Sequence, residues 1–441
     1  MVFGDTIAAI ATAPGRGGVA VVRVSGPEAF GVAERIADKD PQPGRVRFVR
    51  LRGLVSKVSR LKSKATEDVR RKTSDVIDTG LLLAFKAPHS YTGEDVVEFQ
   101  CHGGAVTPRR ILEACCAAGA RLARRGEFTQ RAFLNGKLDY DQAESVLDLV
   151  DAKTVRAADA ALEGLSGRKR RELADLYRAA LDLSTRLEHA LDVDEGELPA
   201  DFIGNLKFEI SDLKSQIADA RRRANEGKIL RTGARIVLAG PPNAGKSSLM
   251  NALLEENRAI VSDVPGTTRD SIESWLDLDG WPIRLVDTAG LRETRDEVEA
   301  EGVKRAEELL AKADLVLWLG PPSSVFRLPS SVIRLHPKCD LGRGEGLNVS
   351  ARTGEGLDEL KRAIVAKLEE KVSAADEGDA PDGAVAAFHE ALALLDGGRG
   401  EDLVLLANAV RAAAERLGAA TGATYSSDLL DNLFSRFCVG K

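Results

Sequence analysis

The stretch IVLAGPPNAGKSSLMNALL, residues 236–254, decides the fold of the central part of this chain. Its apolar start is typical of a short buried strand and its end of a helix, so Gly240–Ser247 forms the loop between them. The loop has the pattern G-x-x-x-x-G-K-[ST], in which backbone N–H groups and a helix N-terminus bind phosphate. We expect Lys246 to contact the β- and γ-phosphates of a nucleotide and Ser247 to hold Mg²⁺.

Two further motifs follow in the order that a P-loop nucleotide hydrolase requires. The segment IRLVDTAG, residues 283–290, reads as a strand that ends at Asp287. We expect Asp287 to reach the magnesium ion through water and the Gly290 amide to sense the γ-phosphate. Between the two motifs lies PGTTRD, residues 265–270, in which Thr268 is placed to complete the metal shell.

Base recognition is predicted from Pro337-Lys338-Cys339-Asp340 and Ser350-Ala351-Arg352. GTP-binding proteins use N-K-x-D here because a carboxylate accepts two hydrogen bonds from the guanine edge. Pro337 replaces the Asn of that motif. We therefore predict guanine, with adenine or loosened selectivity as the alternative. The segment 321–330 is short where a GTPase usually has a helix.

The chain on either side of this segment has a different character. Residues 5–25, 76–85 and 96–104 read as strands, and a helix is expected from Pro108 to about Ala118. Elsewhere apolar residues recur at helical 3–4 spacing. These residues are Leu173, Leu176, Ala180, Leu183, Leu187 and Leu191; Leu206, Ile210, Leu213 and Ile217; Leu403, Leu406, Val410, Ala413 and Leu417; and Leu429, Leu430, Leu433 and Phe437.

The predicted fold class is therefore multidomain. We expect an α+β domain over residues 1–135 and an all-α helical bundle domain in two parts, 136–232 and 371–441. An α/β P-loop GTPase domain, 233–370, is inserted in the helical domain.

Composition limits the setting and the partners. Five scattered cysteines without a C-x-x-C pair argue against a zinc or disulfide framework and for a cytoplasmic protein. The N-terminus does not read as a signal peptide, and no apolar run reaches the roughly 18 residues of a membrane span. The net charge of −6 argues against a nucleic-acid-coated protein. Basic clusters at 45–72, 168–171 and 221–223 are either solvated faces or local phosphate contacts with an RNA.

Almost end to end, the chain resembles the family of tRNA uridine 5-carboxymethylaminomethyl modification GTPases, known as MnmE or TrmE. Seven stretches carry the resemblance. They are DTIAAIATAPGRGGVAVVRVSGP, YTGEDVVEFQCHGG, GEFTQRAFLNGKLDYDQAESVLDLVDAKT, GPPNAGKSSLMNAL, VPGTTRD, DTAGLRETRDEVEAEG and the final FCVGK. Pro337, the short segment after Gly320 and the basic stretch 45–72 depart from the family pattern.

The resemblance implies an N-terminal domain similar to folate-binding one-carbon enzymes, through which members form homodimers. Members work with a flavoprotein, MnmG or GidA, in a heterotetramer or larger complex that modifies the wobble uridine of certain tRNAs. A 5-formyl- or 5,10-methylene-tetrahydrofolate supplies the one-carbon unit. By motif, folate contacts fall on Arg23, Glu98, Lys137 and Lys441.

For the nucleotide domain, the resemblance implies K⁺ as well as Mg²⁺. By motif, the potassium ligands are Asn243, Ser262, Val264 and Thr267, the magnesium ligands Ser247 and Thr268, and the catalytic residues Glu299, Thr268 and Lys246. The implied GTP contacts are Asn243, Ala244, Gly245, Lys246, Ser247, Ser248, Ser262, Asp263, Val264, Pro265, Gly266, Thr267, Thr268, Asp287, Thr288, Ala289, Gly290, Lys338, Asp340, Ser350, Ala351 and Arg352.

Three further alternatives stay open at this point. Leu291 lacks the polar group that orients water in many GTPases, and Arg269 or Arg292 are other candidates to offset the developing charge. Cys438 is either a catalytic thiol or a small apolar packing group. The whole chain is a folate-dependent modification enzyme or an assembly GTPase, akin to ribosome-biogenesis switches, whose N-terminal domain binds a partner.

Overall fold

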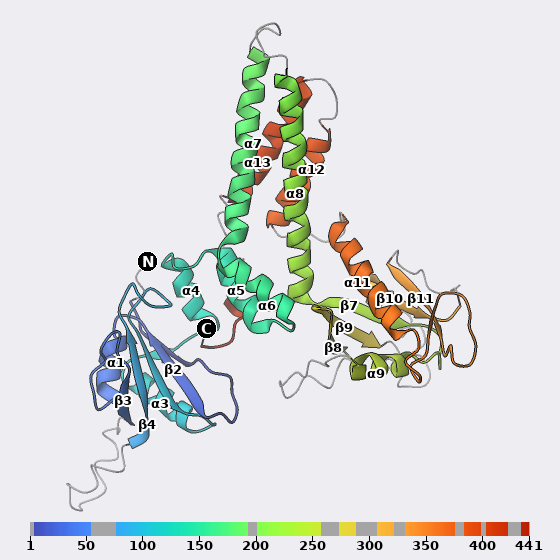
Figure 1. Cartoon of the computed structure of the whole chain (residues 1–441). Coiled ribbons are helices and arrows are strands. Elements are labelled where there is room, and N and C mark those ends of the chain that lie inside the picture. Colours follow the sequence, from blue (N-terminus) through green and yellow to red (C-terminus); the bar gives the residue numbers. More distant parts are fainter. Residues whose placement is uncertain are drawn as a thin grey trace, which may run out of the picture. The chain divides into compact units, whose positions relative to one another are not determined.

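The computed structural model describes residues 4–53, 76–192, 201–256, 273–287, 307–321, 331–374, 383–397, 403–421 and 434–440. The chain divides into two compact units, drawn in Figure 1. Residues 1–147 and 424–441 form the first unit, and residues 148–423 form the second. The C-terminal segment therefore belongs to the same unit as the N-terminal domain.

A mixed sheet forms the centre of the first unit, in the order β3-β4-β5-β2-β1-β6. Its strands are β1 (Ile7–Ile10), β2 (Val19–Ser25), β3 (Arg47–Arg52), β4 (Val76–Phe85), β5 (Val96–His102) and β6 (Arg121–Leu122). All pairs are antiparallel except β1 with β6. The helices of this unit are α1 (Ala29–Ile36), α3 (Thr107–Ala117), α4 (Glu127–Leu134) and α5 (Tyr140–Asp151), which crosses the boundary between the units.

Side-chain alternation on β2 separates the core of this unit from its other face. Ala20, Val22 and Val24 are buried in one cluster with residues of α1 and α3. Arg23 lies between them in sequence and therefore points to the opposite face of the sheet. The antiparallel register places Arg23 directly across from Glu98 on β5. The predicted strands at 5–25, 76–85 and 96–104 and the predicted helix after Pro108 are all present.

The C-terminal segment packs on the first unit. Phe434 and Phe437 are buried in a cluster with Ala143 and Leu147 of α5. The Arg125 Nε donates a hydrogen bond of 2.9 Å to the Phe437 carbonyl oxygen. The 3–4 spacing assigned Phe437 to the helical bundle, but its side chain is buried in this separate cluster with α5, because an aromatic residue at helical spacing is equally suited to any apolar cluster.

A helical bundle forms one part of the second unit. Its helices α7 (Arg168–Asp192), α8 (Phe202–Thr232), α12 (Gly383–Gly397) and α13 (Leu403–Thr421) share one apolar core. The predicted apolar residues of α7, α8 and α13 are buried there, except that Leu403 is only partly buried and Leu191 is exposed. Leu191 is 42% exposed and Ala190 is buried instead, because the buried stripe continues three residues after Leu187 rather than four.

The nucleotide domain is built on a second sheet, in the order β12-β11-β10-β7-β9-β8. Its strands are β7 (Ala234–Ala239), β8 (Glu273–Leu278), β9 (Trp281–Asp287), β10 (Leu315–Leu319), β11 (Val332–Pro337) and β12 (Leu347–Val349). Only β8 runs antiparallel to its neighbour. Helices α9 (Lys246–Glu256) and α11 (Leu357–Ser373) contribute to its core. A central strand such as β7 is buried on both faces and reads as a continuous apolar run.

Helix α6 (Val155–Leu165) joins the bundle to the nucleotide domain within the second unit. The Arg156 guanidinium lies 4.1 Å from the centre of the Trp281 ring and pairs with Glu226 of α8 at 2.6 Å. Thr154 donates a hydrogen bond of 2.8 Å to the Gly280 carbonyl oxygen. These contacts tie the β8–β9 turn to two helices.

The fold class predicted from the sequence is confirmed: an α+β N-terminal domain, a helical domain and an α/β P-loop domain inserted in the helical domain. The predicted domain boundaries stay a prediction. Over the part of the chain that the structure describes, no helix combines the length and apolarity needed to cross a bilayer.

Candidate functional site

The phosphate loop connects β7 to α9 at the middle of the second sheet. Gly240 has φ of +146°, and a side chain there would lie 2.3 Å from the Leu319 carbonyl oxygen, so only glycine fits. Asn243 adopts the left-handed conformation, with φ of 61°. The loop then enters α9 at Lys246, where the helix N-terminus favours an anion.

Lys246 is directed across this loop. Its side chain is nearly buried, and its Nζ donates hydrogen bonds to the carbonyl oxygens of Gly240 at 3.1 Å and Pro241 at 3.0 Å. Both acceptors belong to the loop itself. The ammonium is therefore held where the pattern expects a phosphate group to be contacted.

Ser247 and Asp287 come together from opposite ends of the motif. Asp287 ends β9, next to β7 in the sheet, and the Ser247 Oγ donates a hydrogen bond of 2.6 Å to its Oδ2. This pair fits the magnesium site predicted from the sequence, because Mg²⁺ usually keeps several waters and takes further ligands from substrate phosphates. Among the described residues, no group of three or more His, Cys, Asp or Glu side chains is placed to hold a metal ion.

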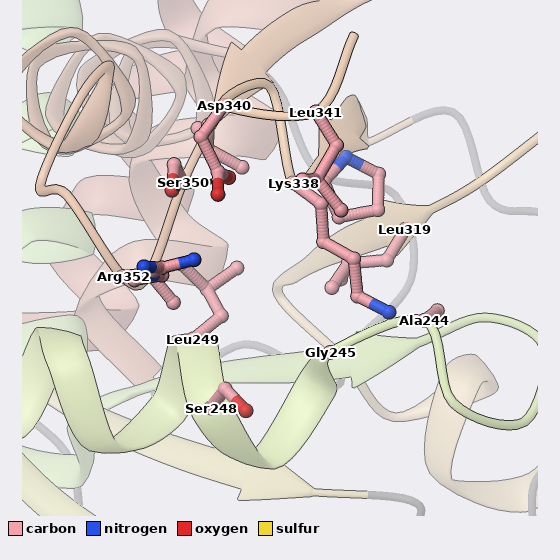
Figure 2. Close-up of a pocket in the computed structure, with 13 residues that line it drawn as sticks. Ala244, Gly245, Ser248, Leu249, Leu319, Lys338, Asp340, Leu341, Ser350 and Arg352 are labelled. Carbon is pink, nitrogen blue, oxygen red and sulfur yellow. Dashed lines mark hydrogen bonds between the residues drawn. The ribbon is translucent and has the colours of Figure 1, made fainter.

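A cavity of about 230 Å³ lies beside the phosphate loop (Figure 2). Its walls come from the phosphate loop and α9, from the end of β10, and from the loops that follow β11 and β12. Among the predicted nucleotide contacts, it gathers Ala244, Gly245, Ser248, Lys338, Asp340, Ser350, Ala351 and Arg352. The structure thus brings together the phosphate loop and both predicted base-reading motifs.

Asp340 is oriented inside this cavity by Ser350. The Ser350 hydroxyl, which is buried, donates a hydrogen bond of 2.7 Å to the Asp340 Oδ1. The Ser350 backbone is itself held, because its N–H donates to the Glu355 carbonyl oxygen and its carbonyl oxygen accepts from Gly354. A carboxylate fixed in this way presents acceptors to paired N–H donors, as guanine offers.

Several cavity residues were not predicted from the sequence. Leu249, Leu319, Leu341 and Val349 supply apolar walls, and Pro337 lines the cavity as well. Leu341 is 78% exposed although it follows Asp340 directly. The position of Leu341 directly after the predicted base-reading carboxylate was the one signal in the sequence for an apolar wall here. Leu249, Leu319 and Val349 lie in a helix and in strands, where apolar residues also serve the core.

Many predicted nucleotide residues lie outside the described residues. These are Ser262, Asp263, Val264, Pro265, Gly266, Thr267, Thr268, Thr288, Ala289, Gly290 and Glu299, together with Arg269, Leu291 and Arg292. The short segment after Gly320 also falls there, except for Pro321.

Two of the predicted folate residues form an ion pair in the first unit. The Arg23 Nε donates to the Glu98 Oε1 at 2.8 Å, and both side chains are about one-fifth exposed. The Arg23 guanidinium lies 5.4 Å from the centre of the Tyr91 ring and 5.6 Å from that of Phe128. Aromatic side chains thus flank a partly exposed ion pair, an environment that strengthens charge-assisted contacts.

The other predicted residues of this site are placed as follows. Lys137 is exposed and its Nζ donates a hydrogen bond of 3.1 Å to the Pro88 carbonyl oxygen. Lys441 lies outside the described residues. Cys438 is exposed, and its carbonyl oxygen accepts a hydrogen bond from the Gly126 N–H. The exposed thiol does not match the interpretation of Cys438 as a buried packing group.

Comparisons with known proteins agree over the whole chain. Residues 6–137 match the family model for the GTP-binding protein TrmE N-terminus, and residues 141–438 match that for the MnmE helical domain. The chain is 43% identical to a tRNA modification GTPase MnmE of Symbiobacterium thermophilum, over 99% of both chains. It is 40% identical to one of Azoarcus sp., over 99% of this chain and 98% of the other. Among solved structures, the G domain of the T. maritima FeoB iron transporter is 28% identical, with a TM-score of 0.24, over 30% of this chain and 98% of that one. On full-length identity and on both family models, the chain belongs to the MnmE family of tRNA modification GTPases.

Proposed function

We propose that this chain is a potassium-dependent GTPase that modifies the wobble uridine of certain tRNAs. With a flavoprotein partner, it adds a carboxymethylaminomethyl or aminomethyl group at C5 of the uridine. A tetrahydrofolate supplies the one-carbon unit. The observation that carries the proposal is full-length membership of the MnmE family together with a preserved phosphate loop, base cavity and Arg23–Glu98 pair.

The nucleotide site supports the GTPase part of the proposal. Lys246 would neutralise charge on the β- and γ-phosphates, while Ser247 and Thr268 would hold Mg²⁺ and Asp287 would bind one of its waters. Asp340 would select guanine. The Leu291 side chain has no polar atom to orient the attacking water, so another group must align the water, and a further cation would offset the charge that develops between the β- and γ-phosphates.

Potassium is the cation that we propose. Asn243 lies in the phosphate loop with an exposed, neutral side-chain carbonyl, which suits a weakly hydrated monovalent ion better than a carboxylate would. Ser262, Val264 and Thr267 would complete its oxygen ligands when two nucleotide domains meet. Glu299 would position the attacking water, and hydrolysis would be coupled to domain dimerisation and a conformational change.

The first unit would bind the one-carbon carrier. Folate has a glutamate tail, with which Arg or Lys would form an ion pair. Its pterin ring has an edge of N–H donors, from which a carboxylate would accept hydrogen bonds. Arg23, Glu98, Lys137 and Lys441 offer this combination of charges. We also propose that the chain forms a homodimer through this unit, acts in the cytoplasm, and joins the flavoprotein MnmG (GidA) in a heterotetramer or larger complex.

Mass analysis of wobble uridines tests the function directly. tRNA from cells that lack the protein should lose the carboxymethylaminomethyl group, and the wild-type chain should restore it. Complementation with Lys246→Ala and with Arg23→Ala should each fail, because one lacks a phosphate contact and the other a folate contact. Unchanged wobble uridines in the deletion strain would instead favour an assembly GTPase.

A further inference from the structure

The loop between β4 and β5, residues 86–95, contacts the proposed folate residues from two sides. Its Tyr91 ring flanks the Arg23 guanidinium, which pairs with Glu98. Its Pro88 carbonyl oxygen accepts the hydrogen bond from Lys137. This loop therefore contacts both the Arg23–Glu98 pair and Lys137.

Buried polar groups hold the loop on the sheet. Thr92 and Ser25 are fully buried, and their hydroxyl oxygens are 2.7 Å apart. The Ser25 Oγ also donates to the Glu94 Oε2 at 2.7 Å, and Asn135 donates to the Thr92 carbonyl oxygen at 2.8 Å. Ser25 on the strand β2 thus holds both Thr92 and Glu94, and Asn135 at the end of α4 holds Thr92.

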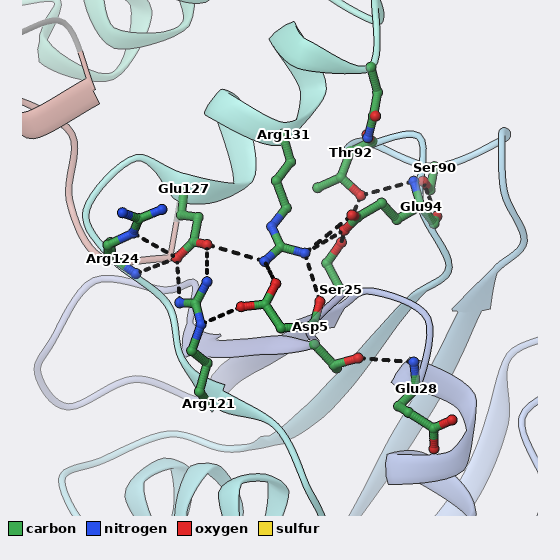
Figure 3. A network of polar contacts seen from close by, with 12 residues as sticks. Asp5, Ser25, Glu28, Ser90, Thr92, Glu94, Arg121, Arg124, Glu127 and Arg131 are labelled. Carbon is green, nitrogen blue, oxygen red and sulfur yellow. Dashed lines mark hydrogen bonds and ion pairs between the residues drawn. The ribbon is translucent and has the colours of Figure 1, made fainter. Parts of the chain in front are cut away.

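Arg131 of α4 is the centre of the polar network shown in Figure 3. Its guanidinium is fully buried and pairs with Glu94 at 3.1 Å, with Asp5 at 2.8 Å and with Glu127 at 3.1 Å. Arg121 pairs with Glu127 and Asp5 as well. The network joins α4, the start of β1 and the 86–95 loop.

A buried ionic network of this kind is an inefficient way to stabilise the attachment of a loop. Removing several charges from water opposes folding, and well-packed apolar residues often stabilise a core equally well. What ion pairs and hydrogen bonds supply in addition is a defined geometry, because their strength depends on direction. Gly93 adds to the definition: with φ of +79°, a side chain there would lie 3.2 Å from carbon atoms of Asn135 and Lys137.

We propose that Thr92 and Glu94 are positioning residues of the tetrahydrofolate site, which act through the 86–95 loop on Arg23 and Lys137. This inference rests on the proposed folate function. Neither residue needs to touch the ligand. Their role is to keep Tyr91 against Arg23 and Pro88 against Lys137 before the carrier binds, so that less ordering is needed on binding.

Matched variants of the full-length chain test the proposal. Thr92→Val keeps the shape and removes the hydroxyl, whereas Thr92→Ser keeps the hydroxyl. Glu94→Gln removes the charge that faces Arg131. Arg124→Ala is the control, because Arg124 pairs with Glu127 at the exposed side of the same network, and among the described residues none of its hydrogen bonds or ion pairs reaches the loop. Affinity for 5-formyltetrahydrofolate is measured by calorimetry, and hydrogen exchange is followed in the peptide that covers residues 86–95.

We expect Thr92→Val and Glu94→Gln to weaken binding about fivefold or more, the size of one lost hydrogen bond, and to speed exchange in the loop. Thr92→Ser and Arg124→Ala should stay within about twofold of the wild type. In an Arg23→Ala background, Thr92→Val should weaken binding much less than alone, because the loop acts partly through Arg23.

Any other result would contradict either the positioning role of Thr92 and Glu94 or the folate proposal. Faster hydrogen exchange with unchanged folate affinity would show that Thr92 and Glu94 have only a structural role. The same conclusion would follow if the losses of affinity caused by Thr92→Val and Arg23→Ala were independent, so that the double variant showed their full product. Unchanged exchange and affinity in both variants would overturn the positioning role as well. A wild-type chain that does not bind the folate, or an Arg23→Ala variant of unchanged affinity, would overturn the folate proposal itself.

Discussion

The Lys338 ammonium donates a hydrogen bond of 3.1 Å to the backbone carbonyl oxygen of Asn243, which joins the base-reading loop to the phosphate loop. Both residues adopt left-handed backbone conformations, with φ of 59° and 61°. Pro337 occupies the position where an Asn side chain would otherwise brace the phosphate loop, and it offers neither an amide side chain nor an N–H. The Lys338 contact thus links the two loops even though Pro337 replaces the asparagine.

Removing this link should weaken the binding of all guanine nucleotides equally. We expect Lys338→Met to lower the affinity for GTP and GDP about tenfold, somewhat less than the loss of a full charged contact, with the preference for guanine over adenine unchanged. Fluorescent nucleotide titrations measure both quantities. A change in base preference would contradict the assignment of Lys338 as a link between loops.

Asp340→Asn should invert base selection. The amide replaces one acceptor with a donor, so xanthine nucleotides should bind better than guanine nucleotides. Competition between GTP and xanthosine triphosphate measures the ratio. Ser350→Ala is the matched control: it removes the hydrogen bond that orients Asp340 and should weaken GTP binding while guanine stays preferred. An Asn variant that still prefers GTP would show that Asp340 does not read the base.

Hydrolysis should depend on potassium and on Asn243. We expect strong stimulation by potassium and little by sodium, with nucleotide domains that dimerise only in potassium plus a transition-state mimic. Asn243→Ala should lose the stimulation and still bind GTP, and Glu299→Ala should lose turnover and still dimerise. Steady-state phosphate release at matched ionic strength provides the measurement. Equal rates in both salts would redirect attention to Arg269.

Arg23→Ala should weaken tetrahydrofolate binding at least about tenfold, or about 1.4 kcal/mol, as expected for loss of a charge-assisted contact. Phosphate release by the nucleotide domain should not change, because Arg23 belongs to the other compact unit. Arg109→Ala serves as the control, since Arg109 forms an exposed ion pair with Glu113 in the same unit. If calorimetry gave equal folate affinity for the wild type, Arg23→Ala and Arg109→Ala, the assignment of Arg23 to the folate site would be wrong.

The first unit should lose stability in acid through Glu127. Burial by itself would raise the pKa of Glu127, but hydrogen bonds from Arg121, the Arg124 backbone and Arg131 outweigh it and lower the pKa to about 2. Because the folded pKa lies below the unfolded value near 4.5, the contribution is complete above about pH 4.5 and is lost as the pH falls toward 2.

Hydrogen exchange of the α4 peptide between pH 5 and 3, corrected for the intrinsic rate, measures this loss. Glu127→Gln should flatten the dependence on pH and lower protection at pH 7, since it leaves Arg121 and Arg131 without that charge. An equally steep acid dependence in the Gln variant would assign the effect to other carboxylates, such as Asp5, whose pKa is also lowered: its hydrogen bonds with Arg121 and the charges of Arg131 and Arg121 outweigh desolvation.

Local features of this protein could be predicted from the sequence. The strand, loop and helix around Gly240–Ser247 are contiguous, so the phosphate loop needs no distant residue to be recognised. The β4 strand and the α3 helix were predicted to within a residue for the same reason. Apolar periodicity placed the stripes of α7, α8 and α13, because a helix that packs on one face must repeat near every 3.6 residues.

Arrangements of distant residues were decided only by the tertiary structure. Leu249, Leu319 and Leu341 come from three separate segments, and only the sheet order that sets β10 and β11 beside β7 brings them to one cavity. Periodicity assigned Phe437 to the bundle, yet it is buried against α5. Nothing in the sequence singled out Arg131, although it pairs with Asp5, Glu94 and Glu127 and is completely buried. The physical reason is the same in each case: burial and ion pairing depend on which surfaces meet in space, and a single residue's type and neighbours in sequence do not carry that information.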